Sequence, residues 1–166
     1  GSRAASHACD VRDEASIARA RDEVIAGLGP PDVLVNNAGI VRRGTLVEET
    51  APSDWDEVVS VNLRGAFLVA RAFLPAMKAR GAGRLVNVAS ISSTIGCPRN
   101  ASYAASKWGL LGLSKSLAEE LRGTQLASLA VLPGSVDTDM LVGSGFEPQL
   151  TPEDVAATIV YLGLDA

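Results

Sequence analysis

Three short apolar runs alternate with helix-like segments along this chain, and each run ends in a polar or glycine-bearing turn. The runs are residues 33–35, 85–88 and 129–132, followed by Asn36-Asn37-Ala38-Gly39, Ala89-Ser90 and Pro133-Gly134. Uninterrupted apolar strands are typical of parallel sheets, because parallel strands need long crossovers and the crossover helices cover both faces. The pattern therefore predicts a doubly wound α/β fold, a Rossmann-like parallel sheet in three α/β/α layers.

Helical periodicity marks three longer segments. Apolar residues recur at helical spacing over 13–26, 54–78 and 100–122. A hydroxyl followed by an early carboxylate predicts a helix start at Ser53 with Asp56, and another at 151–154, where a proline strengthens the signal. Residues 4–9 are expected to be the tail of a further strand, so the sheet in this chain is expected to be incomplete.

Composition and charge exclude several other classes of protein. The chain has 166 residues, of which 47% are hydrophobic and 20% charged, and we expect a single domain over 1–166. The net charge is −4 and the basic residues are scattered, so a nucleic-acid partner is not expected. Two distant cysteines and one histidine predict no metal site, no disulfide framework and a cytoplasmic location. The apolar stretch 65–77 is interrupted by Arg71 and Pro75, so no membrane span is expected.

A tyrosine and a lysine four residues apart provide the first chemical signal. Tyr103 and Lys107 lie near the start of the segment 100–122, and this spacing places both side chains on one helix face. A nearby cation favours the phenolate, so Lys107 is expected to lower the pKa of Tyr103 and to make it a general acid or base. Taken alone, the pair is equally typical of a solvated helix face.

Five motifs in order give the pair a context. They are Asn36-Asn37-Ala38-Gly39 after a strand, Val61-Asn62-Leu63 in a helical stretch, Ser90 at a strand end, Tyr103 with Lys107, and Pro133-Gly134 after the next strand. In order and spacing this set resembles the short-chain dehydrogenase/reductase family. The resemblance extends from Cys9-Asp10-Val11 to the helix after Pro152.

The resemblance implies four catalytic residues. Tyr103 matches the acid/base that gives a proton to a carbonyl or takes one from an alcohol, and Lys107 matches the residue that lowers the tyrosine pKa and binds the nicotinamide ribose. Ser90 matches the hydroxyl that holds the substrate oxygen, and Asn62 matches the residue that positions a water behind Lys107. Two alternatives stay open: Asn62 could simply cap or kink its helix, and other nearby serines could take the place of Ser90. Those serines are Ser92, Ser93, Ser102 and Ser106.

The resemblance also implies a nicotinamide cofactor, NAD or NADP. The matching residues are Asp10 and Val11 at the adenine, Asn37, Ala38 and Gly39 beside the adenosine ribose, Tyr103 and Lys107 at the nicotinamide ribose, and Pro133, Gly134, Val136 and Thr138 near the carboxamide and pyrophosphate. Glycine lets the backbone approach a ligand closely. Taken singly, Asp10 could equally be a helix cap and Gly39 an ordinary turn residue.

The sequence departs from the family pattern in one important respect. The glycine-rich turn of Thr-Gly-x-x-x-Gly-x-Gly type, whose helix binds the pyrophosphate, does not occur in the 166 residues. The strand that distinguishes NAD from NADP and the closing strand are not found either. We therefore expect a fragment of a longer enzyme, truncated at both ends and inactive by itself. In the family's strand order, this leaves the strand at 33–35 with an exposed edge.

The expected function is hydride transfer between NAD(P) and a secondary alcohol or ketone, similar to that of a 3-oxoacyl reductase. A short loop at 140–150 and Cys97 suggest a partly apolar substrate. The alternatives are a catalytically silent cofactor-binding or scaffold protein and a sugar-nucleotide epimerase or dehydratase, which the Asn-Asn-Ala-Gly turn disfavours. The resemblance further implies a homodimer or homotetramer through helices around 62–78 and 100–122, with Phe73 and Leu113 near the subunit contacts.

Overall fold

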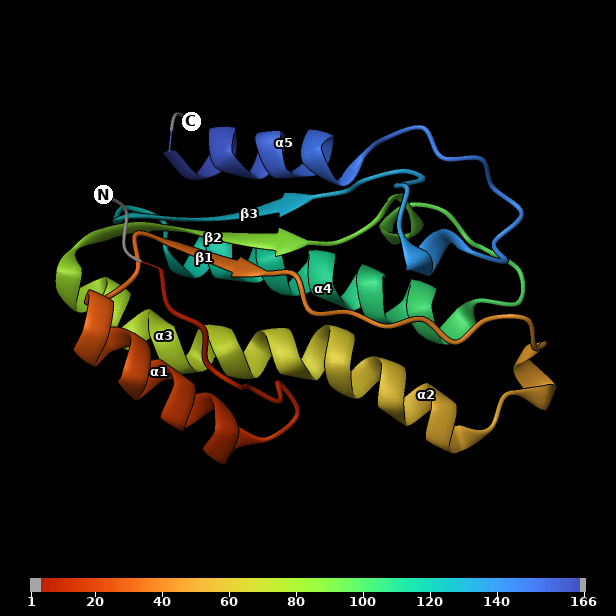
Figure 1. The fold of residues 1–166 in the computed structure, drawn as a ribbon, viewed down its shortest axis with the longest axis horizontal. Coiled ribbons are helices and arrows are strands. Elements are labelled where there is room, and N and C mark those ends of the chain that lie inside the picture. The colour runs from red at the N-terminus through yellow and green to blue at the C-terminus, as the bar shows by residue number, and fades with distance from the viewer. Residues whose placement is uncertain (1–3, 165–166) are drawn as a thin grey trace.

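The computed structural model describes residues 4–164 and contains a parallel sheet between two layers of helices (Figure 1). The strands are β1 (Val33–Asn36), β2 (Ala82–Val88) and β3 (Gln125–Val131), in the order β1-β2-β3. The helix α5 (Pro152–Leu164) covers one face, and α3 (Ala66–Arg80) and α4 (Ala101–Glu120) cover the other. The predicted doubly wound α/β class with an incomplete sheet is confirmed.

The strands β2 and β3 begin earlier than their apolar runs, whereas β1 begins at Val33 as predicted. The β3 strand starts at Gln125 and includes the buried Ser128, whose hydroxyl lies 3.4 Å from the Asn87 amide of β2 and 3.2 Å from the Ser114 hydroxyl of α4. Asn87 also accepts a hydrogen bond of 2.9 Å from the Asn36 amide of β1. A polar network therefore crosses the sheet interior, where the pattern of apolar residues predicted the strands to be shorter.

Two helix starts show how local sequence sets the elements. In α1 (Glu14–Leu28), the carboxylate of Asp13 accepts hydrogen bonds from the Ala15 and Ser16 amides at 3.0 and 3.2 Å. Before α5, the Thr151 hydroxyl accepts from the Asp154 amide and the Asp154 carboxylate accepts from the Thr151 amide. This reciprocal capping satisfies backbone donors at the helix start, and it confirms the predicted start at 151–154.

The segment predicted as one helix over 54–78 is a longer helical stretch with an irregular centre. It consists of α2 (Pro52–Val59), a π-helical turn η2 (Ser60–Gly65) and α3. The predicted cap at Ser53 is wrong: Ala51 precedes the helix without a side-chain cap bond, and Pro52 is its first residue. Short 3-10 turns occur at η1 (Val47–Glu49), η3 (Ile91–Ser93) and η4 (Asp139–Leu141).

The whole helical stretch Pro52–Arg80 is long and apolar enough, by length and composition, to cross a membrane. Pro75 does not interrupt it, contrary to the expectation from the sequence. The core helix of a water-soluble protein passes the same test, and 39% of its most apolar window is buried inside this fold. We treat the stretch as a core helix because α3 packs on β1 and β2.

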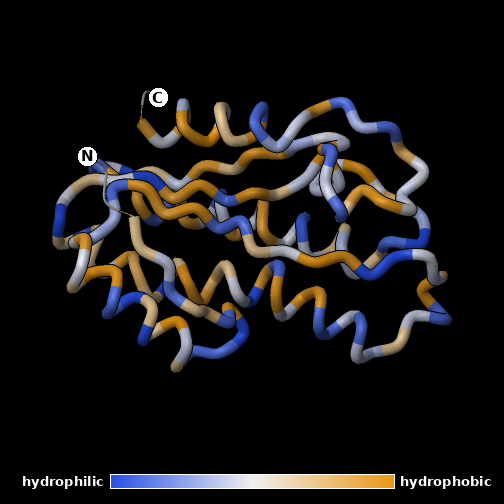
Figure 2. Tube along the Cα trace, viewed as in Figure 1, coloured by the Kyte–Doolittle hydropathy of each residue, from blue (hydrophilic) through white to orange (hydrophobic). Residues whose placement is uncertain are grey.

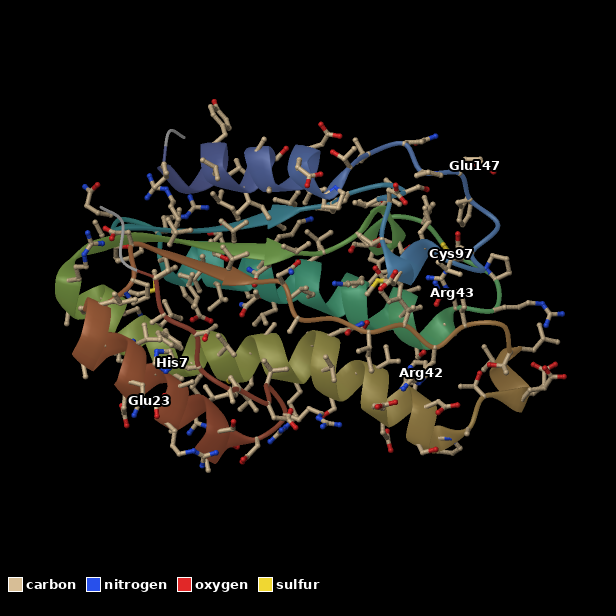
Figure 3. The ribbon with its side chains drawn as sticks, in the orientation of Figure 1. His7, Glu23, Arg42, Arg43, Cys97 and Glu147 are labelled. Carbon is tan, nitrogen blue, oxygen red and sulfur yellow. The ribbon has the colours of Figure 1, made fainter. Side chains whose placement is uncertain are left out.

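The predicted strand at residues 4–9 is wrong. This segment has no regular secondary structure and runs past α1, where the His7 imidazole contacts the Glu23 carboxylate at 2.6 Å (Figure 3). A strand needs a hydrogen-bonding neighbour, and within residues 4–164 only β2 pairs with β1. The outer edge of β1 is therefore unpaired in the described part of the chain, as the sequence led us to expect.

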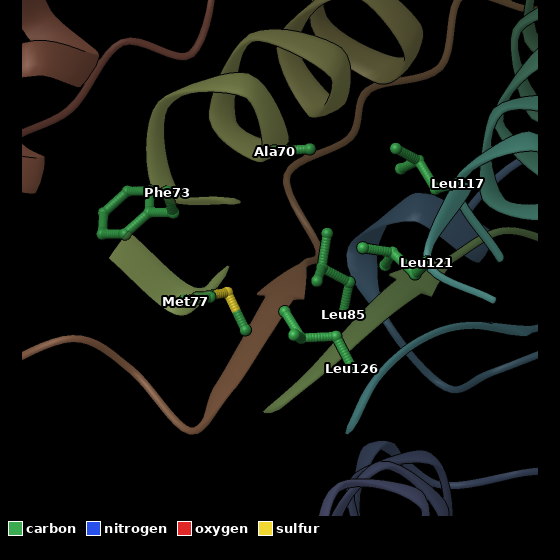
Figure 4. Close-up of a cluster of buried hydrophobic side chains, with 7 residues drawn as sticks. All are labelled: Ala70, Phe73, Met77, Leu85, Leu117, Leu121 and Leu126. Atoms are coloured by element: carbon green, nitrogen blue, oxygen red, sulfur yellow. The ribbon is translucent and has the colours of Figure 1, made fainter. Parts of the chain in front are cut away.

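The core lies between the sheet and the layer of α3 and α4. Figure 2 shows hydrophobic residues along the strands and alternating with hydrophilic ones along the helices. The close-up in Figure 4 shows the main buried cluster, which consists of Ala70, Phe73, Met77, Leu85, Leu117, Leu121 and Leu126. Phe73 is only 8% exposed, so it belongs to the core of the chain and not to its surface. Leu113 is half-buried against this cluster, and its position near the subunit contacts stays a prediction. The exposed aromatic residues on the helices are Trp55, Phe67, Trp108 and Tyr161.

Candidate active site

The carboxyl ends of the three strands meet at one edge of the sheet. Beyond β2, the Ala89 amide donates to the Val131 carbonyl at 2.8 Å and the Ile91 amide donates to the Pro133 carbonyl at 2.9 Å. These bonds continue the strand pairing and hold Ser90 beside the end of β3. In parallel α/β sheets this edge is where ligands bind.

Tyr103 and Lys107 extend from the first turns of α4 toward this edge. The Lys107 side chain is almost buried, with 4% of the residue exposed, and its Nζ donates to the Val88 carbonyl at 2.7 Å. The same Nζ lies 5.7 Å from the centre of the Tyr103 ring. The predicted helix face is therefore directed at the sheet edge and not at solvent.

Burial shifts the pKa of both groups. Desolvation of the phenol raises the pKa of Tyr103 above its ordinary value of 10.0, although a hydrogen bond from Ser90 and the charge of Arg43 act in the opposite direction. Desolvation lowers the pKa of Lys107 to about 8. The expected net lowering of the tyrosine pKa is therefore wrong for this structure, because burial of the phenol outweighs the effects of Ser90 and Arg43.

Ser90 is the serine whose side chain lies close enough to Tyr103 to lower the pKa of its phenol. Its Oγ also accepts from the Ser92 amide at 3.1 Å, which fixes the start of η3. The neighbouring Ser93 hydroxyl is directed elsewhere and donates to the Lys107 carbonyl at 2.9 Å. Among the serines that the sequence left open, Ser90 is thus the one in contact with the phenol.

Asn62 neither caps nor merely kinks its helix. It lies in the π-helical turn with 1% of its surface exposed, and its side-chain amide pairs with the backbone of Ile40. Its Oδ1 accepts from the Ile40 amide at 2.8 Å, and its Nδ2 donates to the Ile40 carbonyl at 2.9 Å. The turn thereby ties α2 and α3 to the loop that follows β1. Single π-helical turns of this kind occur frequently at functional sites.

Ser106 links these residues, a role that the sequence analysis did not assign to it. Its hydroxyl accepts from Asn62 Nδ2 at 3.0 Å and donates to the Tyr103 carbonyl at 2.7 Å. Ser106 is fully buried between the π-helical turn and α4. Its position three residues after Tyr103 was the available signal, since that spacing allows a hydroxyl to bond the preceding helix turn.

Gly39 lies beside Lys107, and its lack of a side chain leaves room there for a bound cofactor. A Cβ atom added at Gly39 would lie 3.6 Å from Lys107 Nζ and 3.5 Å from Asn62 Oδ1. Glycine at 39 therefore leaves open the space over the lysine that any side chain would fill. Asn37 and Ala38, which precede it, are exposed directly after β1.

The remaining predicted cofactor residues lie apart from this group. The Asp10 carboxylate is exposed and bonded by the Arg12 guanidinium, and this lowers the pKa of Asp10 to about 2. Val11 packs against Gly65 of the π-helical turn, where an added Cβ would lie 2.8 Å from the valine Cγ2. Neither residue has a recorded contact with Tyr103 or Lys107.

The segment after β3 forms a separate part of the site. Pro133 and Gly134 line a hollow of about 240 Å³ with residues of α5. Val136 pairs with Leu150, and the exposed Thr138 hydroxyl donates to the Val136 carbonyl at 3.4 Å. A larger hollow of about 320 Å³ lies between α1 and α3. That hollow is remote from the polar residues described above, so its size does not mark it as the site.

No cluster of three or more metal-ligating His, Cys, Asp or Glu side chains occurs among residues 4–164. The groups brought together are a phenol, a hydroxyl, a buried ammonium and a carboxamide. Their chemistry is proton donation and hydrogen bonding to an oxygen atom.

Comparisons with known proteins agree with this arrangement. The family model for short chain dehydrogenase matches residues 1–146. A 3-oxoacyl-[acyl-carrier-protein] reductase of Thermotoga maritima is 38% identical, with 94% of this chain and 68% of the relative covered. A D-threitol dehydrogenase of Mycolicibacterium smegmatis is 36% identical, with 96% and 66% covered. The chain thus spans about two thirds of the length of these relatives.

A solved structure extends the comparison to the fold. The gluconate 5-dehydrogenase of Burkholderia cenocepacia J2315, in complex with NADP and tartrate, superposes with a TM-score of 0.87 at 29% identity. The match covers 93% of this chain and 66% of that one. A family model that matches most of the chain, relatives with more than a third of residues identical and the shared fold lead to one conclusion: the chain belongs to the short-chain dehydrogenase family.

Proposed function

We propose that the protein containing this chain transfers a hydride between NAD or NADP and a secondary alcohol or ketone. The observation that supports this most directly is the Lys107 ammonium buried beside the Tyr103 ring, with the Ser90 side chain close enough to the phenol to lower its pKa. One proton donor and one hydrogen-bonding hydroxyl at the same point suit a carbonyl oxygen on which negative charge develops.

In this proposal Tyr103 donates its proton to the substrate oxygen during reduction and takes it back during oxidation. Its raised pKa keeps the phenol protonated at neutral pH, so it is prepared as the acid. Ser90 hydrogen-bonds to the same oxygen and orients it. Lys107 places a positive charge near the ring, and the Val88 carbonyl fixes the position of its Nζ. The nicotinamide would supply the hydride when bound.

The cofactor would lie along the ends of the strands. Gly39 supports this placement because a side chain there would fill the space over Lys107. We assign the flanking contacts to Asn37 and Ala38 on one side, to 133–138 on the other, and to Asp10 and Val11 at the far end.

Replacing Tyr103 with phenylalanine tests the proposal. In the longest protein that the reading frame encodes, Tyr103→Phe removes the proton donor but keeps the ring, and kcat should fall about 10²- to 10⁴-fold. Tyr161→Phe is the matched control, because Tyr161 lies on α5 with 58% of its surface exposed. Both rates are measured by absorbance of the reduced nicotinamide.

Equal activity of the two variants would reject the role of Tyr103. A wild-type protein that binds NADH or NADPH but reduces no ketone would favour the catalytically silent alternative. The relatives named above are a reductase of 3-oxoacyl thioesters and a dehydrogenase of a polyol, so both substrate types belong in the first screen.

We also propose that the protein assembles with copies of itself through α3 and α4. The observation behind this is that Phe67 and Trp108, one on each helix, are 46% and 52% exposed. Large aromatic side chains on a helix surface frequently mark an interface between subunits.

A further inference from the structure

Two consecutive arginines in the loop after β1 have contrasting surroundings. The Arg42 guanidinium forms an ion pair of 2.9 Å with the Glu57 carboxylate of α2. Arg43 is half-buried, and no carboxylate of residues 4–164 lies within ion-pair distance of it. The charge of Arg42 is therefore compensated within the chain, whereas that of Arg43 is not.

Three loops hold Arg43 in place. Its Nη2 donates to the Met140 carbonyl at 2.6 Å, which joins the loop after β1 to the loop after β3. The next residue, Gly44, donates its amide to the Arg99 carbonyl at 2.9 Å, and its own carbonyl accepts from the Arg99 side chain at 3.0 Å. One backbone carbonyl thus binds the guanidinium, and Arg99 anchors the adjacent backbone, without neutralising the charge of Arg43.

Arg43 also lies close enough to Tyr103 for its charge to act on the phenol. Its positive charge lowers the pKa of the Tyr103 phenol, and the Cys97 thiol raises it. Figure 3 shows Arg43 and Cys97 in the same part of the molecule, beyond the carboxyl end of the sheet. A substrate whose oxygen is bonded to Tyr103 and Ser90 would therefore lie close to the positive charge of Arg43.

The hydrogen bonding of Arg43 is incomplete. Its Nε is buried and has no partner, and among the side chains of residues 4–164 only Asn100 Oδ1 shares this property. A guanidinium has five N–H donors, and Met140 accepts from one nitrogen of Arg43. A buried donor without an acceptor is costly, and such groups call for a ligand or a water.

We propose that Arg43 determines substrate specificity by binding the carboxylate of a secondary hydroxy acid or of the corresponding oxo acid. The inference rests on the dehydrogenase function proposed above and narrows its substrate class. A carboxylate accepts two parallel N–H bonds from one guanidinium and neutralises its charge. This adds a charged group to the partly apolar substrate that was expected from the loop 140–150 and Cys97.

Matched pairs of substrates separate this role from a structural one. Four secondary hydroxy acids, namely lactate, 3-hydroxybutyrate, 4-hydroxypentanoate and 5-hydroxyhexanoate, are compared with their methyl esters. Each pair presents the same carbinol with and without a charge, and the series varies the distance between the two groups. Oxidation is measured with NAD and with NADP in the wild type, Arg43→Met, Arg43→Lys and Arg42→Met, all in the longest protein that the reading frame encodes.

The wild type should prefer at least one acid over its ester. Arg43→Met should lower kcat/KM for that acid roughly 10- to 100-fold and leave the ester within about threefold, because only the acid loses charged hydrogen bonds. Arg43→Lys should recover part of the loss. Arg42→Met should leave kcat/KM unchanged for both the acid and the ester, since Glu57 already compensates the charge of Arg42.

Two results would overturn the proposal. One is a wild type that uses the esters as well as the acids. The other is an equal loss on acid and ester in Arg43→Met, which would indicate that Arg43 only supports the loops. If no substrate of either kind turns over, the dehydrogenase function is tested separately with the substrates of the first screen, and calorimetry decides on Arg43. Binding of one of the hydroxy acids that is lost in Arg43→Met and kept in Arg42→Met would support the site, and absence of binding to the wild type would reject it.

Discussion

The ammonium group of Lys107 is buried in the protein. The free-energy cost of removing this charge from water depends on pH. The pKa of Lys107 is about 8 in the folded protein, against an ordinary value of 10.5, because burial disfavours its charged form. Below pH 8 both the folded and the unfolded chains carry the proton, and the folded protein bears the full desolvation cost. Between about pH 8 and 10.5 the unfolded chain binds more protons, so stability rises with pH.

Lys107→Met makes this contribution measurable. The free energy of unfolding of the wild type, minus that of the variant, should increase by about 2 kcal/mol from pH 7 to pH 9.5. Urea titrations at several pH values give both quantities, and the other titrating groups are common to the two proteins. Parallel pH curves for wild type and variant would mean that Lys107 titrates as an exposed lysine.

For individual residues, the sequence predicted which side chains lie together in the site, but it did not predict the direction of their pKa shifts. The spacing of Tyr103 and Lys107 was sufficient to place both on one helix face, as observed. The direction of the tyrosine pKa was not predictable, because it depends on burial by distant loops and on Arg43. Arg43 carried no signal of its own, since its neighbour Arg42 is identical in type and forms an ordinary surface ion pair.

The π-helical turn is the element that brings Asn62 to the loop after β1. Its close packing requires glycine at one position: a Cβ on Gly65 would lie 2.8 Å from Val11 Cγ2 and 3.2 Å from the Val11 carbonyl oxygen. Backbone atoms cannot rotate away as a flexible side chain can, so the loop that carries Val11 would have to move.

Gly65→Ala should therefore destabilise the protein by about 1–3 kcal/mol through overpacking. Gly112→Ala is the control, since no atom lies within 4 Å of its added Cβ, and alanine in this helix should stabilise the protein by about 0.5–1 kcal/mol. Thermal and urea unfolding of both variants test the pair. Stabilisation by Gly65→Ala would show that Val11 does not pack on this turn.

Periodicity predicted the elements better than their boundaries and irregularities. A helix over 54–78 was correct in outline, but the π-helical turn within it leaves the sequence pattern of apolar residues almost unchanged. The strand expected at residues 4–9 failed for a different reason, since a strand is defined by its neighbour and β1 pairs only with β2 among residues 4–164. Local sequence cannot report whether that neighbour is present.

For the whole molecule, the exposed aromatic residues of α3 and α4 are the basis of the proposed self-assembly. Phe73 belongs to the core, so the apolar excess of α3 and α4 is smaller than the sequence indicated. What remains on the outside is Phe67 on α3 and Trp108 on α4, with Trp55 on α2 39% exposed. The neighbour of Trp108, Gly109, would place a Cβ 2.6 Å from Leu63 of the π-helical turn. The helix α4 therefore packs closely against the π-helical turn that precedes α3.

A charge placed on this surface should separate the subunits. We expect the longest protein that the reading frame encodes to sediment as a dimer or tetramer at micromolar concentration, and Phe67→Glu or Trp108→Glu to weaken association at least about tenfold, because a carboxylate would be buried without a partner. Phe146→Glu is the matched control: Phe146 is 67% exposed but lies in the loop after β3, away from both helices. Sedimentation velocity over a concentration series measures all three variants. A monomeric wild type would reject the interface, and equal dissociation by Phe146→Glu would place the contact on the loop rather than on α3 and α4.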